Sequence, residues 1–204
     1  VRQELLRLLV APRAFDLVRA MLEYGFLPLV LRSAPRPTLL KHVAGLEAAL
    51  AAQPDPILRL AALAVEVPED ADRLAERLRL SNDDRRRLLR AAERVLDFGP
   101  DAPEQAARAY LYAEGAAAFR DRVLLSWARS GGAPNSEPWR RRLSLPERWQ
   151  PPRFPIGGDD VMALGLPAGP RVGELLRGLE AWWIAGDFAA DAAALRARLK
   201  ELSG

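Results

Sequence analysis

The sequence predicts an all-α protein, built as an elongated array of helices without a β-sheet. Apolar residues recur at helical spacing along most of the 204 residues, and no segment alternates polar and apolar residues as a strand does. The composition is 50% hydrophobic, 7% aromatic and 28% charged, which is typical of a globular protein with an aliphatic core. No fixed-period repeat is visible, although an irregular array of helix pairs fits the pattern.

The first predicted segment covers residues 1–53. Its expected elements are a helix over 2–9, a helix that begins at Pro12, a buried connector over 26–31 and a helix over 38–53. Leu5 and Leu9 lie one turn apart in the first of these helices. Pro12 suits a first helical turn, where its missing N–H is harmless, and Gly25 favours a helix end.

The second predicted segment covers residues 54–130. Its expected elements are helices that begin near Pro56, at Pro68 and after Ser81, followed by helices over 101–112 and 115–130. The prolines again suit first turns. Ser81 and Asp84 form a weak capping box, in which side chains bind the free N–H groups at a helix start.

The third predicted segment covers residues 131–204. Residues 131–138 combine Gly, Pro, Asn and Ser and are the best linker candidate, and 151–158 form a second non-helical stretch. The expected helices are a short one around Trp139, a long one from Pro170 to Gly186 and a terminal one over 191–202.

The residue types exclude several common catalytic sites. The chain has no Cys, and His42 is its single histidine, which removes thiolate sites and His-rich metal sites. No glycine-rich phosphate loop is present. The adjacent Asp83 and Asp84, like Asp159 and Asp160, lie at predicted helix starts, where capping explains the carboxylates. We therefore expect no catalytic residue, metal ion or cofactor in this chain.

The charge balance alone does not identify a partner. The 30 basic residues exceed the 27 acidic ones by three, and all the basic residues except Lys41 and Lys200 are arginine. Arginine suits nucleic acid, but a GC-rich genome also favours it. No apolar run approaches the roughly 20 residues of a membrane span, and no signal peptide is visible, so we expect a cytoplasmic protein without a membrane partner. The chain enters a helical pattern at its first residue, as a piece of a longer protein would.

An arginine run in the second segment is a candidate RNA interface. Its candidate contacts are Arg86, Arg87, Arg90 and Arg94. Arg87, Arg90 and Arg94 share one helical face, which can follow a phosphate backbone. The alternative is a solvated face that neighbouring Asp and Glu residues neutralise.

A second basic group, in the third segment, lies beside aromatic residues. Its candidate RNA contacts are Arg140, Arg141 and Arg153, which alternate with Trp139, Trp149 and Phe154. Arginines beside exposed rings suit single-stranded or looped RNA, because bases stack on the rings. The alternative is that the rings belong to the core and the arginine stems cover them.

The stretch over residues 157–173 is the most specific pattern in the chain. It reads as a short helix, a turn with Gly165, Pro167 and Gly169, and the start of the long helix. Backbone N–H groups at such a helix start can hold a phosphate. We therefore add Gly169, Arg171 and Gly173 to the candidate RNA contacts.

With this stretch, the sequence resembles the C-terminal part of the bacterial tRNA nucleotidyltransferase and poly(A) polymerase family. The matching segments are residues 2–9, 23–27, 79–82, 119–122, 127–129, 149–155, 157–173 and 182–184. The resemblance covers nearly the whole chain and is strongest to alphaproteobacterial members. It implies a neck-like segment 1–53, a body-like segment 54–130 and a tail-like segment 131–204. The resemblance implies that the catalytic head and upper neck, where the family carries its Gly-Ser, Asp-x-Asp and Glu-Asp-x-x-Arg motifs, lie outside this chain.

The resemblance implies a helical arm that binds tRNA or another RNA and positions its 3′ end for a catalytic head outside this chain. Mg²⁺ and CTP or ATP are expected only for that head, so this chain alone is expected to add no nucleotides. The sequence does not decide between CCA addition and poly(A) addition. The alternative function is a helical protein-interaction or dimerisation module, in which Leu5, Leu6 and Leu9 would be exposed. We expect a monomer or a weak dimer.

Overall fold

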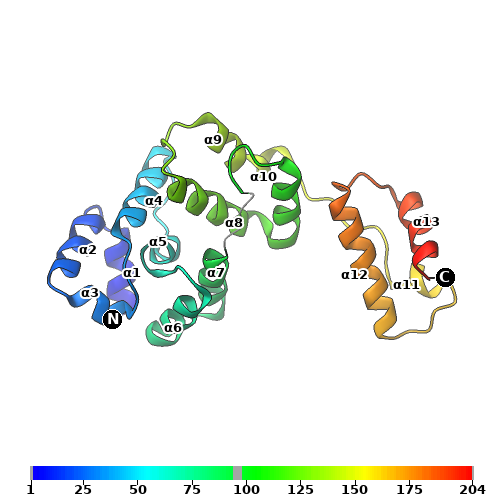
Figure 1. The fold of residues 1–204 in the computed structure, drawn as a ribbon, viewed down its shortest axis with the longest axis horizontal. Helices are drawn as coiled ribbons and strands as arrows, with labels where there is room; N and C mark the ends of the chain where they lie inside the picture. The colour runs from blue at the N-terminus through cyan, green and yellow to red at the C-terminus, as the bar shows by residue number, and fades with distance from the viewer. Residues whose placement is uncertain (1, 94–97, 204) are drawn as a thin grey trace.

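The computed structural model describes residues 2–93 and 98–203. In these ranges it contains thirteen helices and no strand, which confirms the prediction of an all-α, elongated fold. Figure 1 shows two bodies along the long axis, with α1–α10 in the first and α11–α13 in the second. The two ends of the chain lie in different bodies (Figure 1).

The first body packs its helices around α5, which lies at its centre. Its helices are α1 (Arg2–Val10), α2 (Ala14–Glu23), α3 (Phe26–Leu31), α4 (Pro37–Ala49), α5 (Pro56–Ala64), α6 (Pro68–Leu78), α7 (Asn82–Ala92), α8 (Glu104–Ser130), α9 (Glu137–Leu143) and α10 (Leu145–Arg148). Every residue from Ile57 to Ala64 is buried. A helix that is apolar on all sides needs neighbours on all sides. This is why α1, α4, α7 and α8 all contact α5.

Two helix starts follow directly from the local sequence. Asp55 caps α5, because its carboxylate accepts hydrogen bonds from the N–H groups of Ile57 at 2.9 Å and Leu58 at 3.0 Å. Ser81 caps α7, since its Oγ accepts from the N–H of Asp84 at 3.1 Å and donates to the carboxylate of Asp84 at 2.8 Å. The predicted cap by Ser81 is confirmed, whereas the Asp84 carboxylate accepts from the Ser81 hydroxyl rather than from the Ser81 N–H, as a full capping box would have it.

The long helix α8 is two helical pieces that meet at Gly115. The backbone of Gly115 has φ 78° and ψ 171°, a conformation that is open to glycine and strained for other residues. The expected separation between a helix ending near Tyr112 and one beginning at Gly115 is therefore confirmed. The break gives the two pieces different directions, so that the first piece reaches the second body while the second stays in the core.

Two expectations for the N-terminal part are wrong. The predicted buried connector is the helix α3, in which Leu27 and Leu31 are buried but Phe26 is 59% and Leu29 70% exposed. A helix of this length buries only one face, so an apolar run does not make all its residues core. The alternative function, a dimerisation module, expects Leu5 and Leu9 to be exposed on the first helix. Both residues are buried, so this second expectation is wrong as well.

Residues 131–136 turn tightly inside the first body. Trp139, just beyond this turn, stacks on Trp127 with ring centres 5.9 Å apart and planes inclined by 6°. A Cβ on Gly132 would lie 3.0 Å from both indoles, so the turn needs a glycine there. The core of the first body includes Trp139 and Leu145, and it therefore extends past the predicted segment boundary at 131.

The second body has its own small core. Its helices are α11 (Gly158–Met162), α12 (Pro170–Ala185) and α13 (Ala192–Ser203), and the non-helical residues 151–157 lead into it as expected. Its buried residues are Ile156, Val161, Leu175, Leu179, Trp183, Leu195 and Leu199. The predicted start of the long helix at Pro170 and its end at Gly186 are confirmed.

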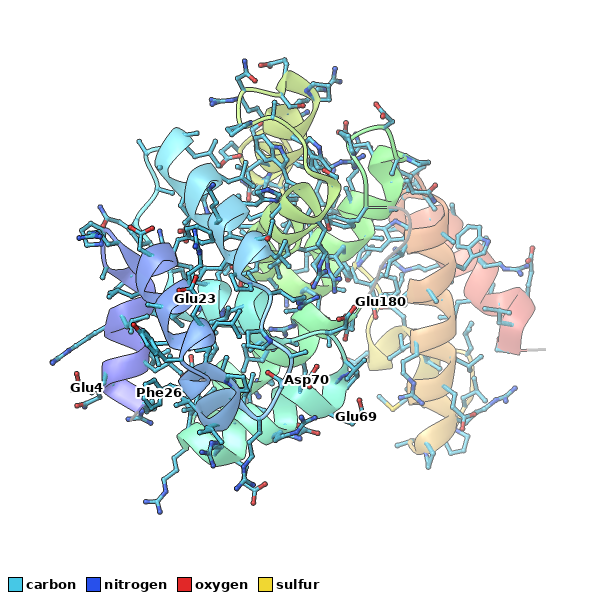
Figure 2. The ribbon with its side chains drawn as sticks, turned by 60° about the vertical axis from the view of Figure 1, so that its left-hand side comes forward. Glu4, Glu23, Phe26, Glu69, Asp70 and Glu180 are labelled. Atoms are coloured by element: carbon cyan, nitrogen blue, oxygen red, sulfur yellow. The ribbon has the colours of Figure 1, made fainter. Side chains whose placement is uncertain are left out.

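The two bodies meet through the first piece of α8. Phe188 lies among three rings, with ring centres 5.2 Å from Tyr112, 5.2 Å from Trp149 and 5.1 Å from Trp183. The hydroxyl of Tyr112 donates a hydrogen bond to the carboxylate of Glu180 on α12. Figure 2 shows Glu180 on the side of α12 that faces the first body. Aromatic contacts and a polar link therefore fix the second body against α8.

Candidate nucleic-acid interface

The structure places the arginines of α7 in different environments. Arg86 is exposed, with 63% of its side chain accessible, and pairs with Asp83 one turn earlier. Arg87 and Arg90 point toward α8, where Arg90 Nε lies 2.6 Å from Glu114 Oε2. Arg94 lies outside the described residues. Of the described candidates on α7, Arg86 is the one most accessible to a large ligand.

Arg87 is held by two carboxylates from different helices. Its Nε and Nη2 donate to Asp121 at 2.9 and 3.1 Å, and Nη2 also donates to Asp55 at 2.7 Å. Burial alone would lower the pKa of the Arg87 guanidinium, but the hydrogen bonds to Asp121 and Asp55 outweigh burial and raise it. Arg87 thus joins the start of α5 to α7 and α8, and its donors already have partners.

The carboxylates of this network respond in opposite directions. Burial acts to raise the pKa of Asp55, but hydrogen bonds from Arg87 and from backbone N–H groups outweigh it, so the pKa is lowered. For Asp121, burial outweighs the hydrogen bonds from Arg87, and the pKa is raised. The hydrogen bonds from Arg87 therefore offset part of the cost of burying the Asp121 carboxylate.

A pocket of about 420 Å³ lies between α5, α7 and α8. Leu58, Ala61 and Leu125 are among its apolar walls. Its charged lining residues are Asp83, Arg86, Arg87, Arg90, Glu114, Asp121 and Arg122. We call this cavity the α7 pocket. The structure thus brings three of the predicted α7 arginines to one concave site.

Two lining residues of the α7 pocket carry no local signal in the sequence. The hydroxyl of Tyr110 is buried and has no hydrogen-bond partner among the described residues. The ring of Tyr110 packs edge-on against Phe98 at 5.2 Å, and the guanidinium of Arg122 lies 5.2 Å from its centre. Glu114 reaches the pocket because α8 passes beside α7. Both residues come from another helix than the arginine run, so spacing along the chain does not find them.

The second basic group also divides by environment. Arg141 and Arg153 are exposed and make no ion pair among the residues that the structure describes. Arg140 is half-buried and donates to the carbonyl oxygens of Pro134 at 3.2 Å and Ala49 at 3.4 Å. Its neighbour Arg142 is buried, and burial lowers the pKa of its guanidinium. Arg141 and Arg153 remain accessible to a ligand.

The rings beside this basic group belong to the cores. Trp139 is buried against Trp127, Trp149 is half-buried against Phe188, and Phe154 packs on Trp183 at 5.4 Å. The expectation that bases stack on exposed rings here is corrected, and the alternative, in which the rings are core, describes these residues. An RNA at this surface would meet guanidinium groups rather than open ring faces.

The stretch over 157–173 folds as a short helix, a turn and a long helix start. Asp160 caps α11 by accepting from the N–H of Gly157 at 2.9 Å, and this bond, together with one from Arg196 at 2.9 Å, lowers its pKa. Gly169 precedes α12 and offers no side chain to cap it, so the first N–H groups lack a side-chain acceptor.

The three candidate residues of this stretch lie at the start of α12. Arg171 is 65% exposed and lies 3.8 Å from Glu174. A Cβ on Gly169 would meet nothing within 4 Å, and one on Gly173 would meet only the side chain of Arg177, at 3.2 Å. Neither glycine is needed for packing within the chain.

Several other features bear on the expected chemistry. His42 Nδ1 lies 3.1 Å from the carbonyl oxygen of Ala128, a contact that joins α4 to α8. Among the described residues, no three His, Asp or Glu side chains are grouped so that they could hold a metal ion. Within the same ranges, no helix has the length and hydropathy needed to cross a membrane.

Comparison with known proteins adds one relative. No family model matches the chain. A protein of Rhodospirillum rubrum, described as "Uncharacterized 28 kDa protein in petA 5'region", is 42% identical over 84 residues. This match covers 38% of the chain and 32% of the relative, so the chain spans about a third of the protein that it matches. The description of this relative states no activity.

Proposed function

We propose that this chain is the C-terminal, RNA-binding helical region of a tRNA nucleotidyltransferase or poly(A) polymerase. In this role it holds the RNA while a catalytic head outside the chain extends the 3′ end. The resemblance of the sequence to that family supports the proposal. The observation that carries it is the exposure of Arg141 and Arg153, which make no ion pair among the described residues.

The exposure of each arginine side chain decides which of the candidates we propose as RNA contacts. Arg86, Arg141, Arg153 and Arg171 are accessible, whereas Arg87 and Arg90 are bound to carboxylates of the chain. Exposed guanidiniums can each neutralise a phosphate, and this binding needs no base-specific contact. The uncapped start of α12, beside Arg171, adds backbone N–H donors that suit a phosphate. We therefore propose a surface that recognises the shape and backbone of RNA.

A double charge reversal tests this surface. The double variant Arg141→Glu with Arg153→Glu should weaken tRNA binding at least about tenfold at low salt. It should also reduce the slope of log affinity against log salt concentration by about one to two, because one to two phosphate contacts are lost. The matched control is Arg7→Glu with Arg13→Glu, at exposed positions near the other end of the first body, which changes the net charge equally. Equal loss in both variants would mean that only net charge matters, and would exclude a defined surface.

A second candidate function is a protein-interaction module. Tyr24 is 77% exposed and lies close in sequence to the exposed Phe26 and Leu29. Together these side chains give an apolar surface to α3 and to the residue pair that precedes it. Figure 2 shows Phe26 at the edge of the first body, in the same region as Glu4 and Glu23. Single exposed apolar residues are common, but a group of them marks a possible interface. Molar mass measured against concentration distinguishes this function, since self-association through α3 would raise the mass.

A further inference from the structure

We propose that the second body docks on the first body through a reversible latch, so that the chain exchanges between a docked and an undocked state. The latch is the turn at Asp187 and Phe188, which follows α12, together with Arg108 and Tyr112 on α8, which contact this turn. We call this contact the interbody latch. Three features of the structure support it, and none of them depends on the proposed RNA-binding function.

The first feature is that the second body has a core of its own. Its buried apolar residues all lie within residues 156–199, whereas those of the first body lie within residues 5–145. Among the described residues, every extensively packed pair of helices lies within one body. The connection over residues 149–157 is non-helical and contains three prolines. Relative motion is the default for two bodies with separate cores, unless a large apolar interface joins them.

The second feature is the backbone of the latch turn. Asp187 has φ 52° and Phe188 has φ 61°, so two consecutive residues with side chains occupy the left-handed region. Helix ends commonly place a glycine there, but Gly186 stands one position earlier and has φ −85°. Residues held in this region cost free energy, persist where surrounding contacts hold them, and are common in switch regions. The latch turn is therefore strained.

The side chains of both strained residues contact the first body. Asp187 Oδ2 accepts a hydrogen bond from Arg108 Nη1 at 2.8 Å. The ring centre of Phe188 lies 5.2 Å from those of Tyr112 and Trp149. Docking thus supplies contacts that offset the strain, and undocking removes those contacts and lets the turn relax. The conformation of the turn and the docking of the second body are therefore coupled.

The third feature is a pair of buried polar atoms without partners inside the latch. Arg108 Nε and Asp187 Oδ1 are buried and have no hydrogen-bond partner among the described residues. Both atoms belong to the ion pair that joins the two bodies. A buried polar atom without a partner raises the free energy of the state that contains it. This ion pair therefore stabilises the docked state less than its short contact suggests, which brings the two states closer in free energy.

The latch also sets the spacing of the proposed RNA contacts, and this consequence rests on the proposed function. Arg141 lies on α9 in the first body, whereas Arg171 lies on α12 in the second. An RNA that contacts both side chains fits one spacing better than the other. Its binding therefore shifts the population toward one of the two states.

The test measures both states in the full chain by single-molecule fluorescence energy transfer. The sequence contains no Cys, so Asn135→Cys and Ala197→Cys, both at exposed positions, place one dye on each body. We expect two populations of transfer efficiency that exchange with one another. A single population that is identical in the wild type and in the latch variants would overturn the proposal.

Two variants weaken the latch. Arg108→Gln removes the ion pair to Asp187 and should raise the ratio of undocked to docked molecules at least about fivefold. Gln105→Ala removes a hydrogen bond to the carbonyl oxygen of Ala185 on α12 and should raise the ratio about twofold. Because the side chain of Gln105 is exposed, this second variant leaves the cores intact.

The matched control is Arg196→Gln. Arg196 pairs with Asp160 at 2.9 Å inside the second body, so this variant also loses one arginine–aspartate pair but should leave the ratio unchanged. An unchanged ratio in both latch variants would overturn the proposal. An equal rise in Arg196→Gln would do so as well, because the cause would then be a general loss of stability.

Addition of saturating tRNA separates this inference from the proposed function. If a bound RNA contacts both bodies, one population should grow at the expense of the other. If tRNA binds without changing the ratio, the coupling to RNA is wrong, while the RNA-binding function stands. If tRNA does not bind but Arg108→Gln still shifts the ratio, the latch stands and the proposed function fails.

Discussion

Arg87 on α7 and Asp121 on α8 form a two-point hydrogen bond, with Nε 2.9 Å from Oδ2 and Nη2 3.1 Å from Oδ1. The same guanidinium reaches Asp55, the residue that caps α5. One side chain from the arginine run therefore ties three helices of the first body together. This relationship gives Arg87 a structural role that its position in a basic cluster does not reveal.

Arg87→Gln is expected to destabilise the first body. It leaves the partly buried Asp121 and Asp55 without their cation, which should lower the free energy of unfolding by about 2 kcal/mol and the Tm by roughly 4–8 °C. Thermal unfolding followed by circular dichroism measures the change. Arg86→Gln is the matched control, and because its ion pair is exposed, it should cost no more than about 0.5 kcal/mol. A Tm of Arg87→Gln equal to that of the wild type would show that this guanidinium is available to a ligand.

The link between Tyr112 and Glu180 should fail at high pH. Burial and the hydrogen bond to Glu180 raise the pKa of Tyr112 to about 12. Because its folded pKa lies above its unfolded value of 10.0, its contribution to stability is present below pH 10 and is lost as the pH rises toward about 12. A tyrosinate absorbance titration should show a step near pH 12 that Tyr112→Phe lacks. An identical curve for the variant would contradict the hydrogen bond.

Phe188→Ala is expected to loosen the second body from the first. The ring contacts Tyr112, Trp149 and Trp183, so its removal empties the centre of the aromatic group between the bodies. Truncating a large aromatic side chain costs about 3–5 kcal/mol when fully buried, and somewhat less is expected for this half-buried ring. Small-angle scattering should show a larger radius of gyration than in the wild type.

The control for this experiment is Trp182→Ala. Trp182 neighbours Trp183 in sequence but is 43% exposed and makes no ring contact in this group. It should leave the radius of gyration unchanged. If both variants keep the wild-type radius, the aromatic group does not hold the bodies together.

Gly173→Ala is expected to raise the stability of α12 and at the same time to lower the affinity for tRNA. The new methyl group meets only the flexible end of Arg177, so the substitution should stabilise α12 by about 0.5–1 kcal/mol through helix propensity. If RNA approaches the helix backbone at this point, the same substitution lowers tRNA affinity. Gly178→Ala, farther along α12 in open space, should give the same stabilisation without a change in affinity. Equal affinities for both variants would remove the start of α12 from the interface.

The sequence predicts those parts of the fold that depend on neighbouring residues. The Ser81 cap, the break at Gly115 and the start of α12 at Pro170 each follow from the conformational preferences of one or two residues. The exposure of Phe26 and the burial of Leu5 depend instead on which other helices lie nearby. Periodicity identifies an apolar face, but it does not say what covers that face.

In the candidate site, too, some features follow from neighbouring residues and others from packing between distant helices. Spacing along α7 places Arg86 and Arg90 one turn apart, as the structure has them. Arg87 differs because its partner Asp121 lies 34 residues away, and only the packing of α8 against α7 brings the two together. Tyr110 enters the α7 pocket for the same reason. Contacts between distant helices therefore decided which arginines remained free.

The most direct test of the central claim is the binding of fluorescently labelled tRNA to the chain, followed by anisotropy at two salt concentrations. We predict micromolar or tighter binding that weakens at least about tenfold between roughly 50 and 200 mM salt, because several phosphate contacts are lost. A single-stranded RNA of the same length should compete poorly. Absence of binding, or equal binding of the two RNAs, would contradict the claim that this chain is a tRNA-holding arm.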